Sequence, residues 1–367
     1  MSTLAKSSGK YRIEDYSLDD LLAMAHQQRA SDLHLTAGLP PMMRIDGRLR
    51  PMEFEPLTPN HSQRLVYSIL TDHQVQVFEG KHELDFSHGI KKMGRFRVNV
   101  FMQRGAVAGA FRLVPGRIPT FEQLGLPPTV RNLTARTSGL ILVTGPTGCG
   151  KSTTLATMID HINANQPVHI VTIEDPIEYV HAHRRAMVNQ RELGLDTYEM
   201  ASALRAVVRE DPDVVLIGEM RDLETIDAAL KIAETGHLVL ATLHTRNAPQ
   251  SVDRVVDVFP PHQQDQIRVL LAGTLEAVLA QQLLPKNGSS GRVLALELLI
   301  VTAGVRNLIR EGKTHQIYSL METGGDLGMQ TMDRALAVLV RQGTVSAEEA
   351  AFRAMDYDNY RRWLSSL

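Results

Sequence analysis

A glycine-rich segment near the middle of the chain carries the residues with the plainest chemistry. Gly145-Pro-Thr-Gly-Cys-Gly-Lys-Ser152 follows the apolar run Gly139–Thr144 and precedes an amphipathic stretch that reaches about Ile162. Glycines let backbone N–H groups turn inward around an anion, and a following helix adds the positive end of its dipole. The order of strand, G-x-x-x-x-G-K-S and helix therefore predicts a site for a nucleoside triphosphate such as ATP.

The residues of this phosphate loop have distinct expected roles. Lys151 is expected to reach the β- and γ-phosphates, and the Ser152 hydroxyl to bind Mg²⁺. Cys149 is the single cysteine, and we interpret it as a small residue and not as a nucleophile. The nucleotide is expected to contact the whole run of Gly145, Pro146, Thr147, Gly148, Cys149, Gly150, Lys151, Ser152 and Thr153.

Three carboxylates follow the next apolar run. Glu174, Asp175 and Glu178 come just after Val168–Ile173, which predicts a buried strand. Carboxylates at that position could hold Mg²⁺ through water, or orient the water that attacks the γ-phosphate. A solvated acidic turn is the alternative interpretation.

A fourth carboxylate follows a strand that resembles a Walker B strand. In the usual form an Asp closes that strand and binds Mg²⁺, whereas here Gly218 holds the place and Glu219 follows it. Asp213 begins the strand, roughly 20 Å from its other end at about 3.3 Å per residue, and is too distant to substitute. Glu219 is therefore the candidate metal ligand.

Two histidines bracket a further apolar run, Leu238–Thr242. If the sheet is parallel, His244 lies at the exit of the strand near the phosphates, where it could sense the γ-phosphate. His237 lies at the entry, and a structural role is the stronger interpretation for it. A zinc site is not indicated, because the fourteen histidines show no tight ligand spacing.

Three arginines of the N-terminal part are candidates for a role at a subunit interface. Arg95, Arg97 and Arg112 lie on predicted strands, and Arg95 and Arg97 share one face by the two-residue period. Ordinary surface charge is the plainer interpretation. The alternative is an arginine supplied across the interface to the transferring phosphate.

The elements that position these residues fall into two patterns. Residues 17–116 predict short strands mixed with helices, an α+β pattern that includes a hairpin signal at Asp46-Gly47. Residues 1–16 are interpreted as an N-terminal arm, and the proline- and glycine-rich 117–128 as a linker. Residues 129–367 alternate strand and helix as far as about Asn247, which predicts an α/β domain with a mainly parallel sheet and a largely helical C-terminal part.

Composition narrows the class of protein. A chain of 367 residues favours two or three domains, and a net charge of −2 gives no general reason to expect nucleic-acid binding. One cysteine fits a reducing, cytoplasmic setting. Met1–Lys10 has no apolar secretory core, and the apolar region Val269–Leu284 is interrupted by polar residues. Any membrane association is therefore expected to be peripheral.

Taken together, the four central motifs resemble the type II/IV secretion ATPase superfamily and, within it, the ATPases that retract type IV pili. The phosphate loop, the acidic EDPIEYVH segment, GEMRD and TGHLVLATLHT stand in family order. The resemblance covers residues 17–330. It extends to Ala30–Leu35, to the Arg95-Phe-Arg-Val strand, and to Val305–Glu311, which resembles a motif associated with retraction and has Gly304 where the family has Ala.

The resemblance implies a fold, an activity and a set of partners. It implies a PAS-like N-terminal domain, a RecA-like P-loop ATPase domain, and a homohexameric ring with nucleotide at the interfaces. Hydrolysis of Mg²⁺-ATP would drive pilus depolymerisation at the cytoplasmic face of the inner membrane, against a membrane-embedded platform protein. By position, it implies that Glu178 is the catalytic carboxylate, Glu219 the Walker B acid, and His237 and His244 the histidine box, with Arg95, Arg97 and Arg112 as interface arginines.

Rival functions remain open at this point. An extension or secretion ATPase of the same superfamily usually carries a four-cysteine zinc element, which one cysteine cannot form. An accessory retraction subunit of low activity is a second alternative. A DNA-translocating motor is not favoured by the near-neutral charge, and a small-molecule kinase would leave the N-terminal module unexplained.

Overall fold

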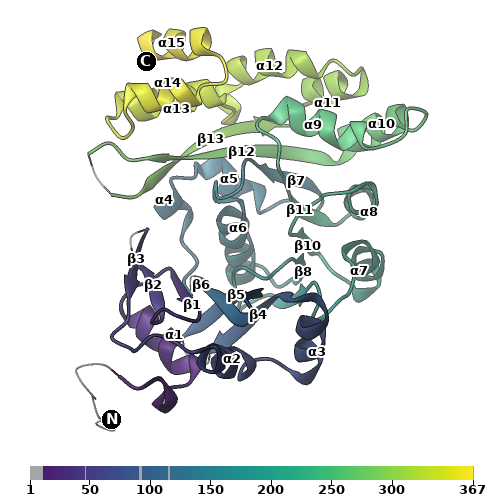
Figure 1. The fold of residues 1–367 in the computed structure, drawn as a ribbon. Helices are drawn as coiled ribbons and strands as arrows, with labels where there is room; N and C mark the ends of the chain where they lie inside the picture. The colour runs from purple at the N-terminus through teal and green to yellow at the C-terminus, as the bar shows by residue number, and fades with distance from the viewer. Residues whose placement is uncertain (1–10, 46, 91–92, 115, 289, 367) are drawn as a thin grey trace. The chain divides into compact units, whose positions relative to one another are not determined.

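The chain divides into two compact units in the computed structural model. The structure describes residues 11–366 except for 46, 91–92, 115 and 289. The first unit comprises residues 1–117 together with 178–180, and the second comprises 118–177 and 181–367. Purple and blue mark the first unit in Figure 1, and teal to yellow mark the second.

An antiparallel sheet forms the centre of the first unit. The described residues give the strand order β3-β2-β1-β6-β5-β4, in which every neighbouring pair is antiparallel. The strands are β1 (Asp32–Leu35), β2 (Met42–Ile45), β3 (Arg48–Pro51), β4 (Glu83–Ile90), β5 (Gly94–Gln103) and β6 (Ala106–Val114). This mixture of strands and helices matches the α+β pattern predicted from the sequence, although Asp46 of the hairpin signal lies outside the described residues.

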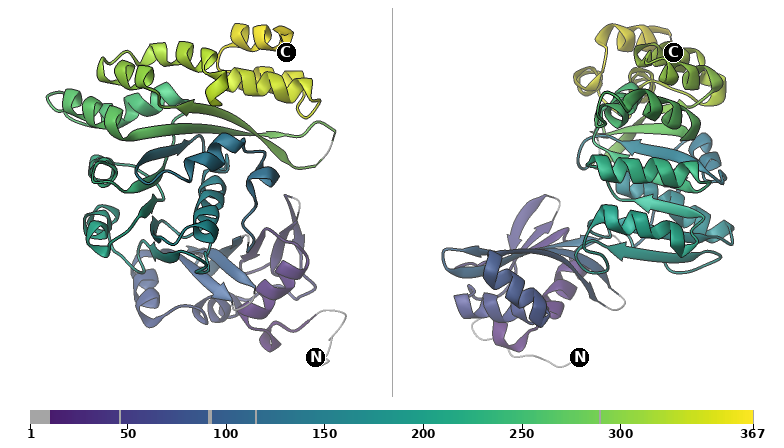
Figure 2. Two further views of the ribbon diagram at one scale, coloured as in Figure 1. Left: turned by 180° about the vertical axis from the view of Figure 1, so that it is seen from behind. Right: turned by 90° about the vertical axis from the view of Figure 1, so that its right-hand side faces the viewer.

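Three capped helices cover one face of this sheet (Figure 2). They are α1 (Leu18–Gln27), α2 (Pro59–Tyr67) and α3 (Asp72–Lys81). Ser17, Thr58 and Thr71 each accept from the backbone N–H three residues on, and each forms a reciprocal capping box. A cap of this kind contributes about 1 kcal/mol to helix stability. The other face of the sheet carries Arg97 and Arg112 together with apolar side chains such as that of Ala108.

The N-terminal arm differs from the prediction over its described part. Residues 1–10 lie outside the described residues. Ile13 is buried, and Tyr11 and Tyr16 pack their rings against the ring of Phe54. Residues 11–16 therefore belong to the core of the first unit, because their three apolar side chains are spaced too irregularly to signal a helix or strand.

A mainly parallel sheet forms the centre of the second unit. The described strands lie in the order β13-β12-β7-β11-β10-β8-β9, and the β12–β13 pair is antiparallel. They are β7 (Gly139–Thr144), β8 (His169–Glu174), β9 (Met187–Glu192), β10 (Val214–Ile217), β11 (Leu238–Leu243), β12 (Leu275–Pro285) and β13 (Arg292–Ile300). The central strands are apolar throughout because helices cover both of their faces.

Helices on the two faces of this sheet build separate apolar layers (Figure 1). One layer is formed by α4 (Phe121–Leu124), α5 (Pro128–Leu133) and α6 (Lys151–Asn165). The other includes α7 (Met200–Val207), α8 (Leu223–Glu234), α9 (Ala248–Asp257) and α10 (Gln264–Thr274). Phe121 and Leu126 are buried in the first layer, so the predicted linker contains a short helix that packs into the second unit.

The C-terminal part contains a long hairpin as well as helices. The strands β12 and β13 pair from Ala277–Ile300 to Pro285–Arg292, and the left view of Figure 2 shows them running beneath the last helices. Those helices are α11 (Ala303–Arg310), α12 (Ile317–Thr323), α13 (Met332–Arg341), α14 (Ala347–Arg353) and α15 (Tyr357–Ser366). The expectation of a largely helical region with a hairpin-like interruption therefore missed the length of both strands. No helix in the described part of the chain is long and apolar enough to cross a membrane.

Candidate functional site

The phosphate loop joins β7 to α6 in the conformation that its glycines permit. Gly145, Gly148 and Gly150 have φ values of 136°, 78° and 94°. Gly150 caps α6 without a side chain, so the first N–H groups of this 15-residue helix face the loop. Lys151 Nζ donates to the carbonyl oxygens of Gly145 and Pro146 at 2.8 and 3.3 Å, which holds its charge over the loop. Turned-in N–H groups around a lysine form a site for phosphate.

Gly145 is required by close packing as well as by its backbone angles. A Cβ atom at this position would lie 2.4 Å from the backbone oxygen of Gln281 and 2.7 Å from Cys149 Sγ. Gln281 is itself buried on β12, and its Nε2 donates to Thr154 Oγ1 of α6 at 2.7 Å. No sequence pattern points to Gln281, which lies over 120 residues from the loop that it supports.

The environment of Cys149 agrees with a packing role. Its side chain is buried, and burial raises the pKa of the thiol, although Lys151 opposes that shift. The thiol therefore stays protonated at neutral pH and is a poor nucleophile. Ser152 and Thr153 are half-buried in the first turn of α6, whereas Thr147 and Gly148 are exposed at the tip of the loop.

Parallel strands bring the other predicted residues to the same edge of the sheet. The strand β11 pairs with β7 from Leu238–Gly139 to Leu243–Thr144, and β10 pairs in parallel with both β11 and β8. The carboxyl ends of these four strands therefore lie together. The loops that follow them carry the phosphate loop, Glu219, His244 and the acidic segment, as the sequence predicts.

Glu219 lies between two basic side chains. Arg221 Nη2 lies 3.0 Å from one carboxylate oxygen and His244 Nε2 lies 3.2 Å from the other. Burial alone would raise the pKa of Glu219, but the hydrogen bonds and charges of Arg221 and His244 hold that pKa below its ordinary value. Glu219 is therefore ionised at neutral pH, as a ligand for a metal or a metal-bound water must be.

Gly218 gives Glu219 its position. A Cβ atom on Gly218 would lie 3.2 Å from Glu174 Cα, tighter than most such contacts, so the loops after β8 and β10 approach closely there. Thr242 Oγ1 donates to the Gly218 carbonyl at 2.6 Å, and Met220 N donates back to the Thr242 carbonyl at 3.1 Å. A side chain at position 218 would require the backbone after β8 to move by a few tenths of an ångström, so this close packing favours glycine at the usual place of the strand-end Asp.

Arg221 is a site residue that sequence reasoning missed. Besides its contact with Glu219, its Nη1 lies 3.7 Å from Asp175 Oδ2. Arg221 therefore joins the loop after β10 to the loop after β8. The signal was present in the GEMRD segment, where a basic residue lies two positions beyond the acid.

The acidic segment after β8 separates into held and exposed carboxylates. Glu174 Oε1 accepts from Thr172 Oγ1 at 2.7 Å and from Gln190 Nε2 at 3.1 Å. The peptide bond between Asp175 and Pro176 is cis, and Glu178 follows it with an exposed side chain. An exposed carboxylate beyond the strand end can accept a hydrogen bond from water, whereas Glu174 is already engaged.

His237 lies outside this site. Its carbonyl accepts from Gly139 N at the beginning of β7, at the sheet edge opposite the phosphate loop. Its Nδ1 lies 3.0 Å from the Ile232 carbonyl and 3.1 Å from Thr235 Oγ1, at the end of α8. The prediction that His237 contacts nucleotide is not met within one chain. His237 and His244 lie at opposite ends of β11, and only the end with His244 adjoins the phosphate loop.

The three candidate interface arginines, Arg95, Arg97 and Arg112, lie on the sheet face that the helices leave open. Arg97 on β5 is directly opposite Arg112 on β6, and both are exposed. Arg95 lies two positions along and donates to Ser87 Oγ on β4. The shared face of Arg95 and Arg97 is confirmed, since Phe96 and Val98 point into the core.

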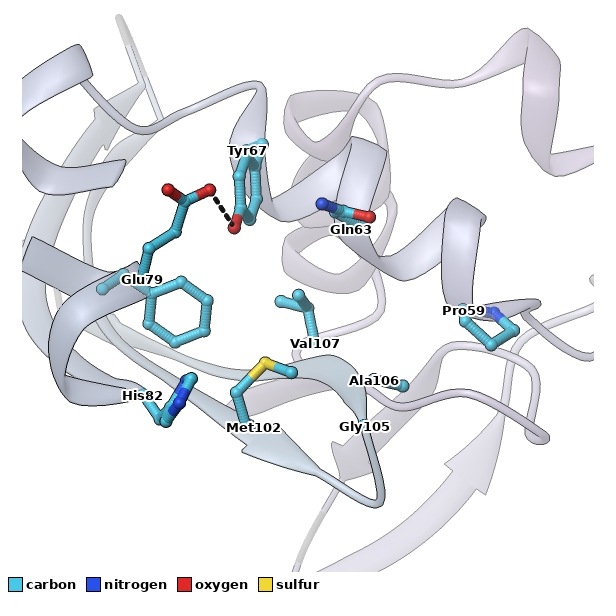
Figure 3. Close-up of a pocket in the computed structure, with 10 residues that line it drawn as sticks. Pro59, Gln63, Tyr67, Glu79, His82, Met102, Gly105, Ala106 and Val107 are labelled. Carbon is cyan, nitrogen blue, oxygen red and sulfur yellow. Dashed lines mark hydrogen bonds between the residues drawn. The ribbon is translucent and has the colours of Figure 1, made fainter. Parts of the chain in front are cut away.

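A pocket of about 200 Å³ lies elsewhere in the first unit, between α2, α3 and the β5–β6 turn (Figure 3). Phe78, Met102 and Val107 line it, and Tyr67 OH donates to Glu79 Oε1 at 3.4 Å across its rim. It is smaller than the ~300 Å³ at which ligand pockets usually begin. Its lining contains none of the predicted site residues.

Comparison with known proteins places this geometry in a family. The family model described as type II/IV secretion system protein matches residues 7–352, which is most of the chain. The chain belongs to the type II/IV secretion system protein family.

Several members of the type II/IV secretion system protein family are similar over nearly the whole chain. The type IV pilus retraction ATPase PilT of Pseudomonas aeruginosa is 49% identical over 94% of this chain and 99% of its own length. The type IV pilus ATPase PilU of the same organism is 41% identical over 94% and 90%. A crystal structure of the pilus retraction motor PilT with bound ADP matches with a TM-score of 0.90 and 50% identity, over 95% and 99%. These similarities confirm the predicted fold class and the resemblance on which it rested.

Proposed function

We propose that this family member is the Mg²⁺-dependent ATPase motor that powers retraction of type IV pili, and hence twitching motility. The observation that carries the proposal is the meeting of four loops at one sheet edge: the phosphate loop, the ion-paired Glu219, His244 and the acidic segment. The similarity to a relative named as a pilus retraction ATPase, greater than to PilU, supports retraction as the task.

The residues of the chain divide the chemistry between them. Lys151 and the loop N–H groups bind the β- and γ-phosphates, and Ser152 with Glu219 holds Mg²⁺, directly or through its water. Mg²⁺ neutralises charge on the phosphates and needs only one or two protein oxygens. Ser152 at the start of α6 and an ionised Glu219 fit that donor set.

Glu178 is the proposed general base. Its exposed side chain can accept a proton or hydrogen bond from the attacking water. His244 contacts Glu219 from the end of the neighbouring strand. Loss of the γ-phosphate would alter the contacts of Glu219 with the bound Mg²⁺, and would thereby alter the contact between Glu219 and His244. We assign His244 the role of reporting γ-phosphate release to the loop before α9.

The motor is proposed to act as a homohexamer at the cytoplasmic face of the inner membrane. Arg97 and Arg112 are exposed on an open sheet face, as residues that reach the nucleotide of a neighbouring copy must be. A platform protein of the pilus is the proposed membrane partner. No nucleic acid is proposed, since the net charge of −2 gives no basis for one.

Phosphate release by the purified protein tests the enzymatic part. The wild-type protein is expected to hydrolyse ATP only with Mg²⁺, and Glu178→Ala to lose at least about a hundredfold in kcat, the usual scale for a general base. Glu224→Ala removes another exposed acid, at the start of α8, and is expected to keep wild-type activity. A Glu178→Ala protein as active as the control would refute the assignment.

A further inference from the structure

A row of charged side chains crosses four strands of the first sheet. Cross-strand pairing places Arg97 opposite Arg112, Arg112 opposite Asp32, and Asp32 opposite Arg44. All four lie on the face that the helices leave open, because Leu33, Val98 and Phe111 beside them point into the core. The row therefore holds three positive charges and one negative charge.

Asp32 lies between Arg112 and Arg44 in this row and contacts both. Its side chain is only 8% exposed, and its Oδ1 accepts from Arg112 Nε at 2.8 Å. Its Oδ2 accepts from Ser31 Oγ at 2.7 Å and lies 3.9 Å from Arg44 Nε. Burial opposes ionisation of Asp32, yet Ser31 and Arg112 hold its pKa below the ordinary value. The carboxylate is therefore ionised and fully engaged.

The contact through Nε matters for what Arg112 can do. A guanidinium held at Nε keeps its two terminal nitrogens together on the other side, and the Arg112 side chain is 71% exposed. Those nitrogens form the fork that binds two oxygens of a phosphate. Rotation of the side chain is restricted before the anion arrives, which lowers the entropic cost of binding.

Arg97 adds a second cation beside this fork. Its side chain is exposed, and within the described part of the chain no hydrogen bond or ion pair is found for that side chain. Like charges directly opposite each other on neighbouring strands destabilise a sheet unless an anion lies between them. Asp32 engages Arg112 from the far side and leaves the side toward Arg97 unneutralised.

We infer that Asp32 is a positioning residue: it orients Arg112, beside Arg97, to bind phosphate oxygens of the nucleotide held by a neighbouring copy of this chain. The inference rests on the proposed hexameric ATPase, and it selects Arg112 with Arg97 over Arg95, which is turned to Ser87. Asp32 itself does not touch the nucleotide.

A double-mutant cycle on kcat tests this role. The variants are Asp32→Asn, Arg112→Ala and the double variant, measured by steady-state phosphate release over a range of Mg²⁺-ATP concentrations. Asp32→Asn keeps an acceptor oxygen but loses the charge, and misplacement of a catalytic group by about 1 Å can cost up to a hundredfold. We expect Asp32→Asn to lower kcat about tenfold with little change in KM, and to cost nothing further in the Arg112→Ala background.

Asp85→Asn is the matched control. It makes the same change on the same sheet face, where Asp85 accepts from Asn99 Nδ2 at 3.2 Å and has no arginine opposite it. It is expected to leave kcat unchanged. Melting temperature and the mass of the assembled ring are measured for every variant. A merely structural role for Asp32 predicts a lower melting temperature and an equal loss of kcat in both backgrounds, which would overturn the inference.

The outcomes separate this inference from the function on which it rests. If Arg112→Ala keeps wild-type kcat, the interface role of that arginine is wrong and the positioning role falls with it. If Arg112→Ala loses activity while Asp32→Asn does not, only the positioning role is refuted. Loss in both single variants without further loss in the double variant supports both.

Discussion

Glu219 is the proposed metal ligand at a strand end that lacks the usual aspartate. The close approach of the loops after β8 and β10 favours glycine at position 218, and the acid comes one residue later. Arg221 and His244 then fix its two oxygens at 3.0 and 3.2 Å. The charge of Arg221 compensates the burial that would otherwise protonate this carboxyl.

Removing Arg221 is expected to change the pH dependence of hydrolysis. Because Arg221 lowers the pKa of Glu219, Arg221→Ala raises that pKa and less of the ionised acid remains as pH falls. The acidic limb of the kcat profile should therefore move to higher pH. Arg209→Ala removes an exposed arginine near the end of α7 and serves as the control. An unmoved limb in Arg221→Ala would contradict the role of Glu219.

Gly145 offers a test of the phosphate loop that separates a steric clash from backbone strain. Gly145→Ala would place Cβ 2.4 Å from the Gln281 oxygen, whereas Gly236→Ala, also at positive φ, meets nothing within 4 Å. Strain alone costs about 1–3 kcal/mol in either variant. We expect a fluorescent ADP analogue to bind Gly145→Ala at least about tenfold more weakly than Gly236→Ala, a difference of ~1.4 kcal/mol. Equal affinities would show that the contact with Gln281 is unimportant.

At the scale of elements, Glu297 on β13 connects α9, which follows the His244 loop, to α13 in the C-terminal part. It is fully buried, and its oxygens accept from Ala248 N at the start of α9 and Met332 N at the start of α13, at 2.7 and 3.2 Å. Burial raises its pKa to about 7, although both N–H groups favour the ionised form. The loop of His244 leads directly into α9, so Glu297 ties that loop to the C-terminal helices.

The raised pKa makes stability depend on pH in a stated direction. Between pH 4.5 and about 7 the folded protein holds a proton on Glu297 that the unfolded chain has released. The free energy of unfolding contributed by this group is therefore highest below pH 4.5 and falls as pH rises to about 7. In denaturant titrations from pH 5 to 8, Glu297→Gln should flatten this fall, whereas Glu234→Gln at the exposed end of α8 should not. A fall as steep in Glu297→Gln as in the wild-type protein would contradict the assignment.

Sequence patterns predicted some elements well and others poorly, for physical reasons. The strands β7, β10 and β11 are continuous apolar runs, and their ends were predicted to within a residue or so. The strand β9 was missed because Met187–Glu192 is an edge strand with few apolar residues. The run Val269–Leu284 divides between α10 and β12. This division was not predicted, because periodicity does not distinguish a buried helix from a buried strand in a short apolar segment.

The candidate site was predictable where chemistry is local in sequence. Lys151, Glu219 and His244 each follow a recognisable strand, so their common edge could be inferred from the parallel sheet. Arg221 and Gln281 could not be inferred in the same way, because their roles depend on contacts between separate loops. The sequence also does not distinguish Glu174 from Glu178. Only the structure shows that Glu174 is hydrogen-bonded to Thr172 and Gln190, whereas the side chain of Glu178 is exposed.

At the scale of the whole molecule, the proposal requires that one copy complete the site of the next. Heterologous contacts of this kind form a ring when the rotation between neighbouring copies closes. Two individually inactive variants then complement each other: Lys151→Ala lacks the phosphate contact, and Arg112→Ala lacks the interface cation. Mixed rings bring an intact Arg112 from one copy to an intact phosphate loop of the other, so ATP hydrolysis should return in the mixture.

Subunit exchange in that experiment needs its own control. Two different affinity tags on Lys151→Ala and Arg112→Ala allow the mixed rings to be isolated by sequential purification. If mixed rings form but stay inactive, the arginine does not act between subunits.

The central claim is that hydrolysis drives pilus retraction, and a deletion strain tests it most directly. Surface pili and twitching are scored in cells lacking the gene, and after complementation with the wild-type or the Glu178→Ala protein. The account predicts that deletion gives hyperpiliated cells that do not twitch. The wild-type protein should restore the normal number of pili and twitching, whereas the Glu178→Ala protein should restore neither. Cells without pili after deletion would contradict retraction and indicate an extension motor instead.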